Sequence, residues 1–83
     1  MKNPLLSVVI PTWNRAQLVC DAVNSALVQG EVEVIVVDDA STDATVERLE
    51  AEFGTRIRVL RLEHRRGAGG ARNAGARLAR GQF

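Results

Sequence analysis

Two adjacent carboxylates, Asp38 and Asp39, stand directly after a run of β-branched apolar residues, Val34 to Val37. Such a run predicts a strand buried on both faces, as in a parallel sheet. Because a bare charge is too costly to bury, we expect both acids to emerge at the carboxyl edge of the sheet, where open α/β sheets bind their ligands. A carboxylate there can accept hydrogen bonds from the N–H of a planar base or from a ribose hydroxyl.

Residues 11–15 bring further functional groups to the same edge of the sheet. They follow a second apolar run at 5–10, and they are Pro11, Thr12, Trp13, Asn14 and Arg15. The indole offers a flat surface on which a base can stack. Later in the chain, small residues at 69–71 let backbone N–H groups approach a phosphate at a helix start, and Arg72 adds a bidentate donor. Aromatic ring, acid and arginine together suit a nucleoside diphosphate.

Alternating strands and helices must position these groups. The apolar patterns predict strands at 5–10, 31–37 and 57–62, and helices at 15–29, 43–53 and 71–80. Pro11 is expected to end the first strand, and Asn14 to cap the first helix. Ser41 or Asp43 is expected to cap the second helix, and a polar, glycine-rich loop at 63–70 to precede the third.

The order β-α-β-α-β-α predicts a three-layer α/β fold. Helices between strands imply parallel strands with right-handed crossovers, and therefore a sheet of order 3-2-1, which is half of a doubly wound nucleotide-binding fold. We interpret residues 1–83 as one partial domain, truncated before a fourth strand. The first strand would then be an exposed apolar edge, through which we expect self-association.

Composition limits the possible functions. The chain has 83 residues, a formal net charge of +1 and a single cysteine, Cys20. The near-neutral charge gives no support for binding nucleic acid. One cysteine excludes an internal disulfide, and we expect Cys20 on a buried helix face. The sequence shows no signal-peptide pattern and no apolar run near the ~20 residues of a membrane span, so we predict a cytoplasmic location.

Three motifs together resemble the N-terminal, nucleotide-binding half of the family 2 glycosyltransferases, which have the GT-A fold. They are the segments 7–15, 34–43 and 70–73, in the family's order and spanning almost the whole chain. The resemblance implies transfer of a sugar from a UDP-sugar, with inversion and a divalent Mg or Mn ion, to a sugar or lipid-linked acceptor. It also implies a role in cell-wall or polysaccharide biosynthesis, in the cytoplasm or at the cytoplasmic face of a membrane.

The same resemblance implies roles for individual residues. The backbone at Pro11 and the ring of Trp13, which stands where tyrosine is usual, would hold the base. Asp39 would bond to the base, and Arg72 would lie near the base and the diphosphate. The family's Asp-x-Asp metal motif and catalytic base lie beyond position 83. We therefore predict no catalytic or metal-binding residue within the chain, and no sugar transfer by these 83 residues alone.

Two other classes of protein stay open on the residues alone. A Val-Val-Asp-Asp strand end is also typical of receiver-like signalling domains. Those domains carry an acceptor aspartate after the third strand and a lysine later in the chain. Here Leu62-Glu63 follow the third strand, and Lys2 is the only lysine. A non-catalytic α/β interaction module would bind no nucleotide. Four arginines are interpreted as a solvated surface: Arg65, Arg66, Arg77 and Arg80.

Overall fold

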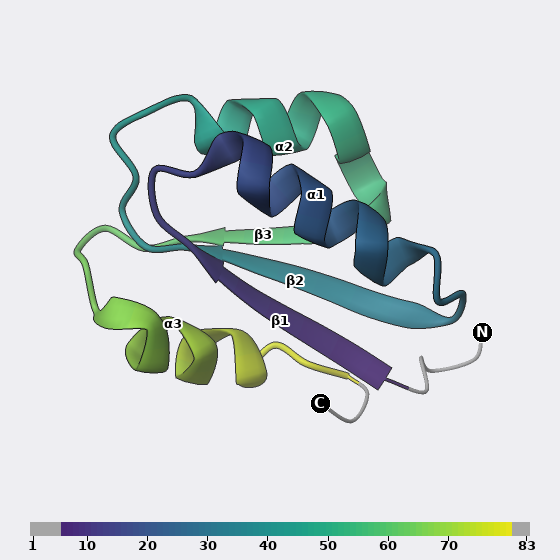
Figure 1. Cartoon of the computed structure of the whole chain (residues 1–83). Helices are drawn as coiled ribbons and strands as arrows, with labels where there is room; N and C mark the ends of the chain where they lie inside the picture. The colour runs from purple at the N-terminus through teal and green to yellow at the C-terminus, as the bar shows by residue number, and fades with distance from the viewer. Residues whose placement is uncertain (1–5, 81–83) are drawn as a thin grey trace.

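Parallel strands and α-helices alternate in residues 6–80, the part of the chain that the computed structural model describes. In chain order the elements are β1 (Leu6–Thr12), α1 (Ala16–Leu27), β2 (Val32–Asp38), α2 (Thr45–Phe53), the 3₁₀ turn η1 (Gly54–Arg56), β3 (Arg58–Arg61) and α3 (Gly67–Ala76). The strands form one sheet of order β1-β2-β3 in which both neighbouring pairs are parallel (Figure 1). The predicted α/β class and the predicted 3-2-1 order are confirmed.

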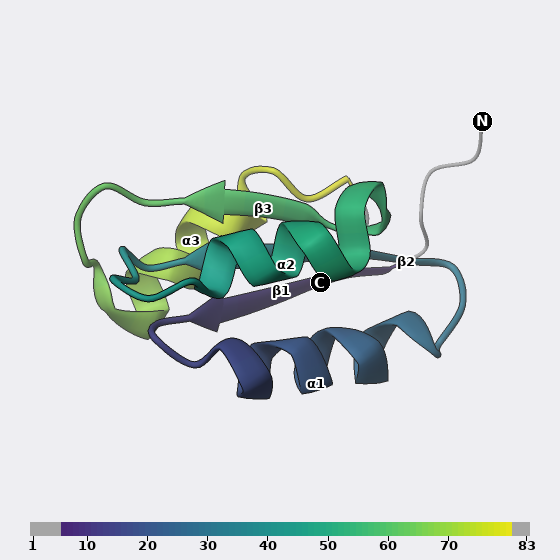
Figure 2. The same ribbon diagram turned by 90° about the horizontal axis from the view of Figure 1, so that it is seen from above.

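β2 lies at the centre of the core because its side chains are buried on both faces of the sheet. Val34 and Val36 belong to the apolar cluster formed with α1 and α2, whereas Ile35 and Val37 pack in a cluster with Ala71 of α3. None of these four β2 side chains is more than 1% exposed. The helices accordingly form two outer layers: α1 and α2 cover one face of the sheet, and α3 covers the other (Figure 1 and Figure 2).

The cluster between the sheet and the α1–α2 layer is built from one face of each helix. Val19 and Val23 of α1 share it with Leu49 and Phe53 of α2. Their three- and four-residue spacing is that of an amphipathic helix with one apolar stripe. Cys20 belongs to the same cluster and is buried, as the sequence predicted.

α3 approaches the sheet closely, and Gly75 makes this approach possible. A Cβ atom at position 75 would overlap Cγ1 of Val9 and lie 2.8 Å from Cγ2 of Val37. Protein interiors are close-packed, so a side chain there would push the helix outward. The missing side chain therefore sets the height of α3 above β1 and β2, and with it the position of its first turn.

Pro11 does not end the first strand, as the sequence had suggested, because β1 continues through it to Thr12. Pro11 lies opposite Val37 in the parallel register, and the carbonyl oxygen of Thr12 accepts a hydrogen bond from the N–H of Asp39. Backbone groups of successive strand residues point to opposite sides, so Pro11 faces the free edge of the sheet. A proline is tolerated there because no ladder hydrogen bond is lost.

α3 begins at Gly67 rather than at position 71, so the second half of the segment predicted as a loop is helical. The reason lies elsewhere in the chain: the Asp39 carboxylate accepts hydrogen bonds from the backbone N–H groups of Arg66 and Gly67, at 2.7 and 3.0 Å. Local helix propensity, which is poor for a glycine-rich segment, does not contain this information. The helix ends at Ala76, earlier than the predicted end at position 80.

The predicted N-caps of the other two helices are also wrong. α1 and α2 have Arg15 and Ala44 at their N-cap positions, and neither makes a side-chain capping bond. Asn14 lies before α1 and bonds elsewhere, whereas Asp43 accepts a hydrogen bond from the N–H of Thr45 from just outside α2. The predicted end of the second helix at position 53 is confirmed, because α2 ends at Phe53 and is followed by Gly54, which has a positive φ of 54°.

The strand order places β1 and β3 at the edges of the described sheet. The edge position of β3 agrees with the alternating arginines in its sequence. Self-association through β1, and the reading of residues 1–83 as a partial domain, stay predictions. Within residues 6–80, no helix combines the length and the apolar character that crossing a bilayer would require.

Glu33 holds together the edge of the sheet at which the strands begin. It lies in β2, is 7% exposed, and accepts hydrogen bonds from the hydroxyl of Ser7 in β1 and from Nη1 of Arg58 in β3. The backbone N–H and Nε of Arg80 add bonds of 2.7 and 2.8 Å. Burial alone would raise the pKa of Glu33, but the hydrogen bonds from Arg80, Ser7 and Arg58 outweigh it and lower this pKa to about 2.

We expect Glu33 to make the stability of the fold sensitive to acid. Its pKa is lower in the folded chain than in the unfolded chain, so the ionised carboxylate stabilises the fold above about pH 5, and this contribution is lost as the pH falls toward 2. Allowing for solvent screening of the two arginines, the loss should be roughly 1–3 kcal/mol. Urea unfolding at a series of pH values measures it.

The matched variants are Glu33→Gln and Glu31→Gln, the latter at an exposed position just before β2. Glu33→Gln should lower the free energy of unfolding at neutral pH and flatten its dependence on pH, because a neutral amide has no proton to gain in this range. Glu31→Gln should follow the wild type. The same pH dependence in wild type and Glu33→Gln would contradict the assignment.

Candidate functional site

The carboxyl ends of the three strands are tied together by backbone hydrogen bonds. The Thr12 carbonyl at the end of β1 accepts from the N–H of Asp39, at 2.8 Å, and the Asp38 carbonyl accepts from the N–H of Leu62, at 2.9 Å. The loops that follow these strands therefore leave the sheet at one place. This is the edge where ligands bind in open α/β sheets.

Asp38 does not emerge into solvent, contrary to the expectation for both acids. Its side chain is fully buried, and its two oxygens accept hydrogen bonds from the backbone N–H of Ser41, at 3.0 Å, and from the Ser41 hydroxyl, at 2.5 Å. These bonds offset the cost of burying the carboxylate. They also shape the turn in which Ala40 has a φ of 64°, a conformation that non-glycine residues seldom adopt. Asp38 thus builds the loop and does not line a cavity.

Asn14 joins the loop after β1 to the loop after β2. Its Oδ1 accepts from the backbone N–H groups of Thr42 and Asp43, at 2.8 and 3.3 Å, and its own N–H donates to the Ser41 hydroxyl, at 2.8 Å. The residue has a φ of 50°, in the left-handed region that asparagine tolerates better than most residues. Asn14 therefore fixes the chain direction directly after Trp13.

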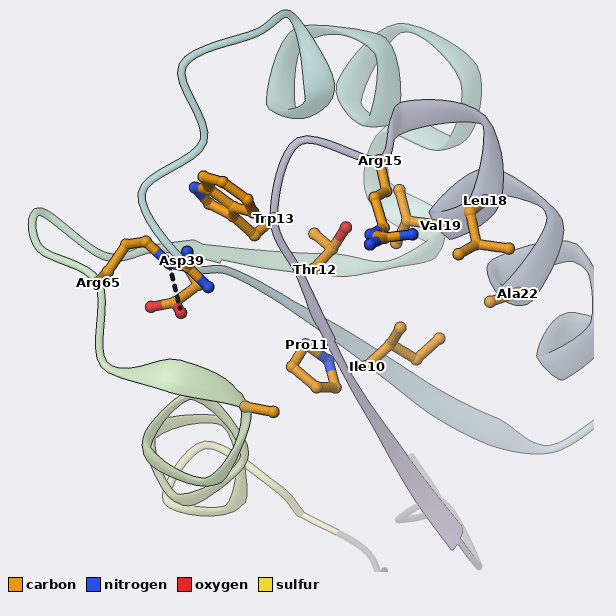
Figure 3. A pocket seen from close by; sticks show the side chains of 11 residues that line it. Ile10, Pro11, Thr12, Trp13, Arg15, Leu18, Val19, Ala22, Asp39 and Arg65 are labelled. Atoms are coloured by element: carbon orange, nitrogen blue, oxygen red, sulfur yellow. Dashed lines mark ion pairs between the residues drawn. The ribbon is translucent and has the colours of Figure 1, made fainter.

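Trp13 carries the exposed aromatic surface of this edge. Its side chain is 38% exposed, and the guanidinium carbon of Arg65 lies 3.9 Å from the ring centroid. Nε of the same arginine lies 3.5 Å from Oδ2 of Asp39 (Figure 3). Arg65 comes from the loop between β3 and α3, so three segments that are distant in the sequence meet at the indole.

Asp39 is the second acid of the pair, and its environment differs from that of Asp38. It is 2% exposed, but it lies at the start of α3, where its oxygens accept the Arg66 and Gly67 N–H bonds described above. A carboxylate at a helix N-terminus is favoured by the unpaired N–H groups and by the helix dipole. Because two carboxylate oxygens together can accept about four hydrogen bonds, Asp39 keeps acceptor capacity for a further donor.

A cavity of about 350 Å³, here called the edge cavity, opens beside these groups. Its lining has a polar end near the indole and an apolar end between β1 and α1 (Figure 3). The residues that line it are Ile10, Pro11, Thr12, Trp13, Arg15, Leu18, Val19, Ala22, Asp39, Arg65 and Ala68. Within residues 6–80, the Thr12 hydroxyl is the buried side-chain polar atom that has no hydrogen-bond partner. The residue lines the edge cavity, but its hydroxyl oxygen is itself buried in the wall.

The structure brings together five of the eight predicted site residues and leaves three outside the edge cavity. Those that line it are Pro11, Thr12, Trp13, Arg15 and Asp39. Asp38 and Asn14 support the surrounding loops, and Arg72 lies exposed on α3 without lining the cavity.

Sequence reasoning missed Arg65, which had been grouped with the solvated arginines. Arg80 was grouped in the same way, yet it pairs with Glu33 at 2.8 Å. A signal for Arg80 did exist, because a glutamate within a buried strand requires a cation. No comparable local signal marks Arg65, whose contacts depend on where the loop after β3 lies.

The described residues do not form a metal site. In the range 6–80, no three histidine, cysteine, aspartate or glutamate side chains gather closely enough to hold a metal ion. The oxygens of Asp38 and Asp39 accept hydrogen bonds from N–H and hydroxyl groups. A cation that bound to these oxygens would compete with those donors. A divalent ion is therefore not placed on these residues.

Comparison with known proteins gives consistent matches over nearly the whole chain. The model of the family described as "Glycosyl transferase family 2" matches residues 7–83. The succinoglycan biosynthesis protein ExoO of Rhizobium meliloti (strain 1021) is 44% identical over 84 residues, which is 99% of this chain and 24% of that protein. Glycosyltransferase GlyG of Streptococcus pneumoniae serotype 4 (strain ATCC BAA-334 / TIGR4) is 37% identical over 85 residues, with 98% and 28% covered.

A solved structure agrees with the sequence matches. The mannosyltransferase PcManGT from Pyrobaculum calidifontis, in complex with GDP-Man and Mn2+, superposes with a TM-score of 0.79 at 31% sequence identity. The match covers 94% of this chain and 25% of that protein. The chain thus spans about a quarter of the length of these relatives.

Asn14 offers a test of how the site loops are held. Asn14→Gly removes the side-chain hydrogen bonds but accepts the positive φ, and we expect it to lower the free energy of unfolding by about 1 kcal/mol. Asn14→Ala also forces a β-carbon into the left-handed region, and we expect a further loss of about 1 kcal/mol. Urea unfolding of both variants measures the two effects. Equal stability of the glycine and alanine variants would show that the left-handed backbone imposes no cost here.

Proposed function

This chain belongs to glycosyl transferase family 2, and from this membership we propose that its edge cavity binds the nucleotide of a nucleotide-sugar donor. The observation that carries the proposal is the gathering of an exposed indole, a carboxylate with spare acceptor capacity and an unpartnered hydroxyl in one cavity. These groups come from Trp13, Asp39 and Thr12, and each matches one requirement of a nucleoside.

The base stacks on Trp13, and its N–H donates to Asp39. An aromatic face provides stacking for any base. A hydrogen bond to a carboxylate favours uracil and guanine, whose Watson–Crick edge carries a ring N–H, over adenine and cytosine, whose ring nitrogen at that edge is an acceptor. The Thr12 hydroxyl is buried in the wall beside them, and it can contact the nucleoside only after its side chain rotates toward the cavity. We propose uracil as the base, and guanine is the alternative to measure because the mannosyltransferase structure contains GDP-Man.

We propose that the diphosphate of the donor binds to the guanidinium groups of Arg15 and Arg72. Arg15 lines the edge cavity. Arg72 is exposed on α3 and does not line the cavity, and its contact with the phosphates is part of the proposal. Guanidinium groups suit this task because their N–H donors match phosphate oxygens in pairs. Asp38 and Asn14 contribute by holding the loops from which Trp13 and Asp39 project.

Sugar transfer itself is a proposal for the whole protein. There we propose an inverting reaction that uses a divalent Mg or Mn ion and transfers the donor sugar to a sugar or lipid-linked acceptor in polysaccharide synthesis. The described residues do not supply a metal site, so no catalytic step is assigned to them. A divalent ion would supply counter-charge to the leaving diphosphate. A cytoplasmic or cytoplasmic-face location also stays a prediction.

Nucleotide binding can be measured by calorimetric titration of UDP and GDP. Trp13→Ala should weaken UDP binding about five- to 150-fold, because stacking of one base is worth about 1–3 kcal/mol. The matched control is Val28→Ala, which removes an exposed apolar side chain that does not line the edge cavity and should leave the affinity within about twofold. If Trp13→Ala binds both nucleotides as tightly as the wild type does, the base is not on the indole.

We expect no sugar transfer by residues 1–83 alone, because the described part offers neither a metal site nor an assigned catalytic base. The measurement is release of UDP from UDP-sugars in the presence of Mn²⁺ and a sugar acceptor, with the full-length protein as the positive control. Turnover by the 83-residue chain would refute this expectation. Binding of no nucleotide at all would instead favour the alternative of a non-catalytic interaction module.

A further inference from the structure

One face of Trp13 is covered by Arg65, whose Nε also lies 3.5 Å from Oδ2 of Asp39. A base that stacks on Trp13 and donates its N–H to Asp39 has to use this face. The guanidinium carbon of Arg65 lies 3.9 Å from the ring centroid, which is the spacing of a stacked pair. A base cannot take that position while Arg65 occupies it. The role of Arg65 therefore has to be explained together with nucleotide binding, and the inference below rests on the proposed function.

The contacts that hold Arg65 on the ring are weak enough to break. Its side chain is 52% exposed, and its ion pair with Asp39 has an N–O distance of 3.5 Å. A cation–π contact at an exposed site changes an equilibrium roughly two- to fivefold, and such an exposed ion pair adds little. Stacking of a base on an aromatic ring is worth about five- to 150-fold. An arriving base is thus able to replace Arg65.

Once a base displaces it from the ring, the guanidinium of Arg65 needs an anion other than Asp39. The lining of the edge cavity contains Arg15, Arg65 and the carboxylate of Asp39, so it carries one net positive charge. Asp39 already accepts two N–H bonds from the start of α3 and would accept another from the base. The diphosphate is the anion that a nucleotide brings with it, and arginine binds phosphate oxygens in a bidentate way.

We propose that Arg65 is an internal occupant of the nucleotide site. In the absence of nucleotide it covers Trp13, and when a nucleoside diphosphate binds it leaves the ring and contacts the phosphates. Arg65 therefore lowers the affinity of the site for a nucleoside that lacks phosphate and raises its affinity for a nucleoside diphosphate. It selects the charged ligand without contacting the base, and it is a positioning and specificity residue for the donor.

The test compares uridine with UDP, because the two ligands should respond to Arg65→Ala in opposite directions. Uridine should bind about two- to fivefold more tightly to the variant, since the competitor on the ring is gone. UDP should bind at least threefold more weakly, since a phosphate contact is lost. Arg77→Ala, which removes the same charge from an exposed position at the opposite end of α3, directly after Ala76, should leave both affinities within twofold.

Other outcomes separate this inference from the proposed function. If Arg65→Ala weakens the binding of uridine as well as that of UDP, Arg65 stacks on the bound base, and the proposal that the base displaces it is wrong. If it changes neither affinity, Arg65 has no role in binding. In both cases a loss of binding in Trp13→Ala would still support the nucleotide site itself. Binding of neither ligand to the wild type would overturn the site and the inference together.

Fluorescence of the ligand-free protein tests whether Arg65 covers Trp13 before a nucleotide binds. Trp13 is the only tryptophan of the 83-residue chain, so its fluorescence reports on this ring alone. Acrylamide should quench it more strongly in Arg65→Ala than in the wild type, because the ring loses its cover. Arg65→Lys, which keeps the charge but lacks the planar group, should be quenched to an intermediate degree. Equal quenching in all three proteins, with unchanged far-UV circular dichroism, would show that Arg65 does not cover the ring.

Discussion

The carboxylate of Asp39 is the interaction on which the site depends. Asp39 directly follows β2. Its carboxylate accepts hydrogen bonds from the N–H groups of Arg66 and Gly67 at the start of α3, and it pairs with Arg65 beside the indole. The backbone N–H of the same residue bonds to the end of β1. One residue thus fixes the relative positions of three segments that are distant in the sequence. Because the carboxylate lies at a helix N-terminus, its charge is stabilised where a ligand can still reach it.

The adjacent acids show how position along a strand gives neighbouring residues different environments. Successive residues of an extended chain point to opposite sides, so Asp38 and Asp39 cannot share one environment. Asp38 turns inward, where Ser41 satisfies both of its oxygens. Asp39 turns toward the edge cavity. The sequence presents the pair as equivalent, and only the geometry of the strand end distinguishes them.

How far the sequence predicts this protein depends on the range of the interactions involved. The buried strand at 34–37, the amphipathic helices and the strand order follow from local patterns and chain topology, and the structure confirms them. The early start of α3 and the position of Arg65 depend on side chains far away in the sequence. The bridge made by Asn14 is of the same kind, since an asparagine before a helix resembles a cap until its actual partners are known.

α3 and the segment after it are fastened to β2 at two places, by Asp39 at the first turn and by Glu33 at Arg80. Between these places, Gly75 lets the helix rest directly on Val9 and Val37. A helix anchored in this way has little freedom to slide or tilt, so adaptation to ligands of different shape falls to the loops around it. Substitutions in those loops can then change the shape of the edge cavity while the anchored frame stays the same.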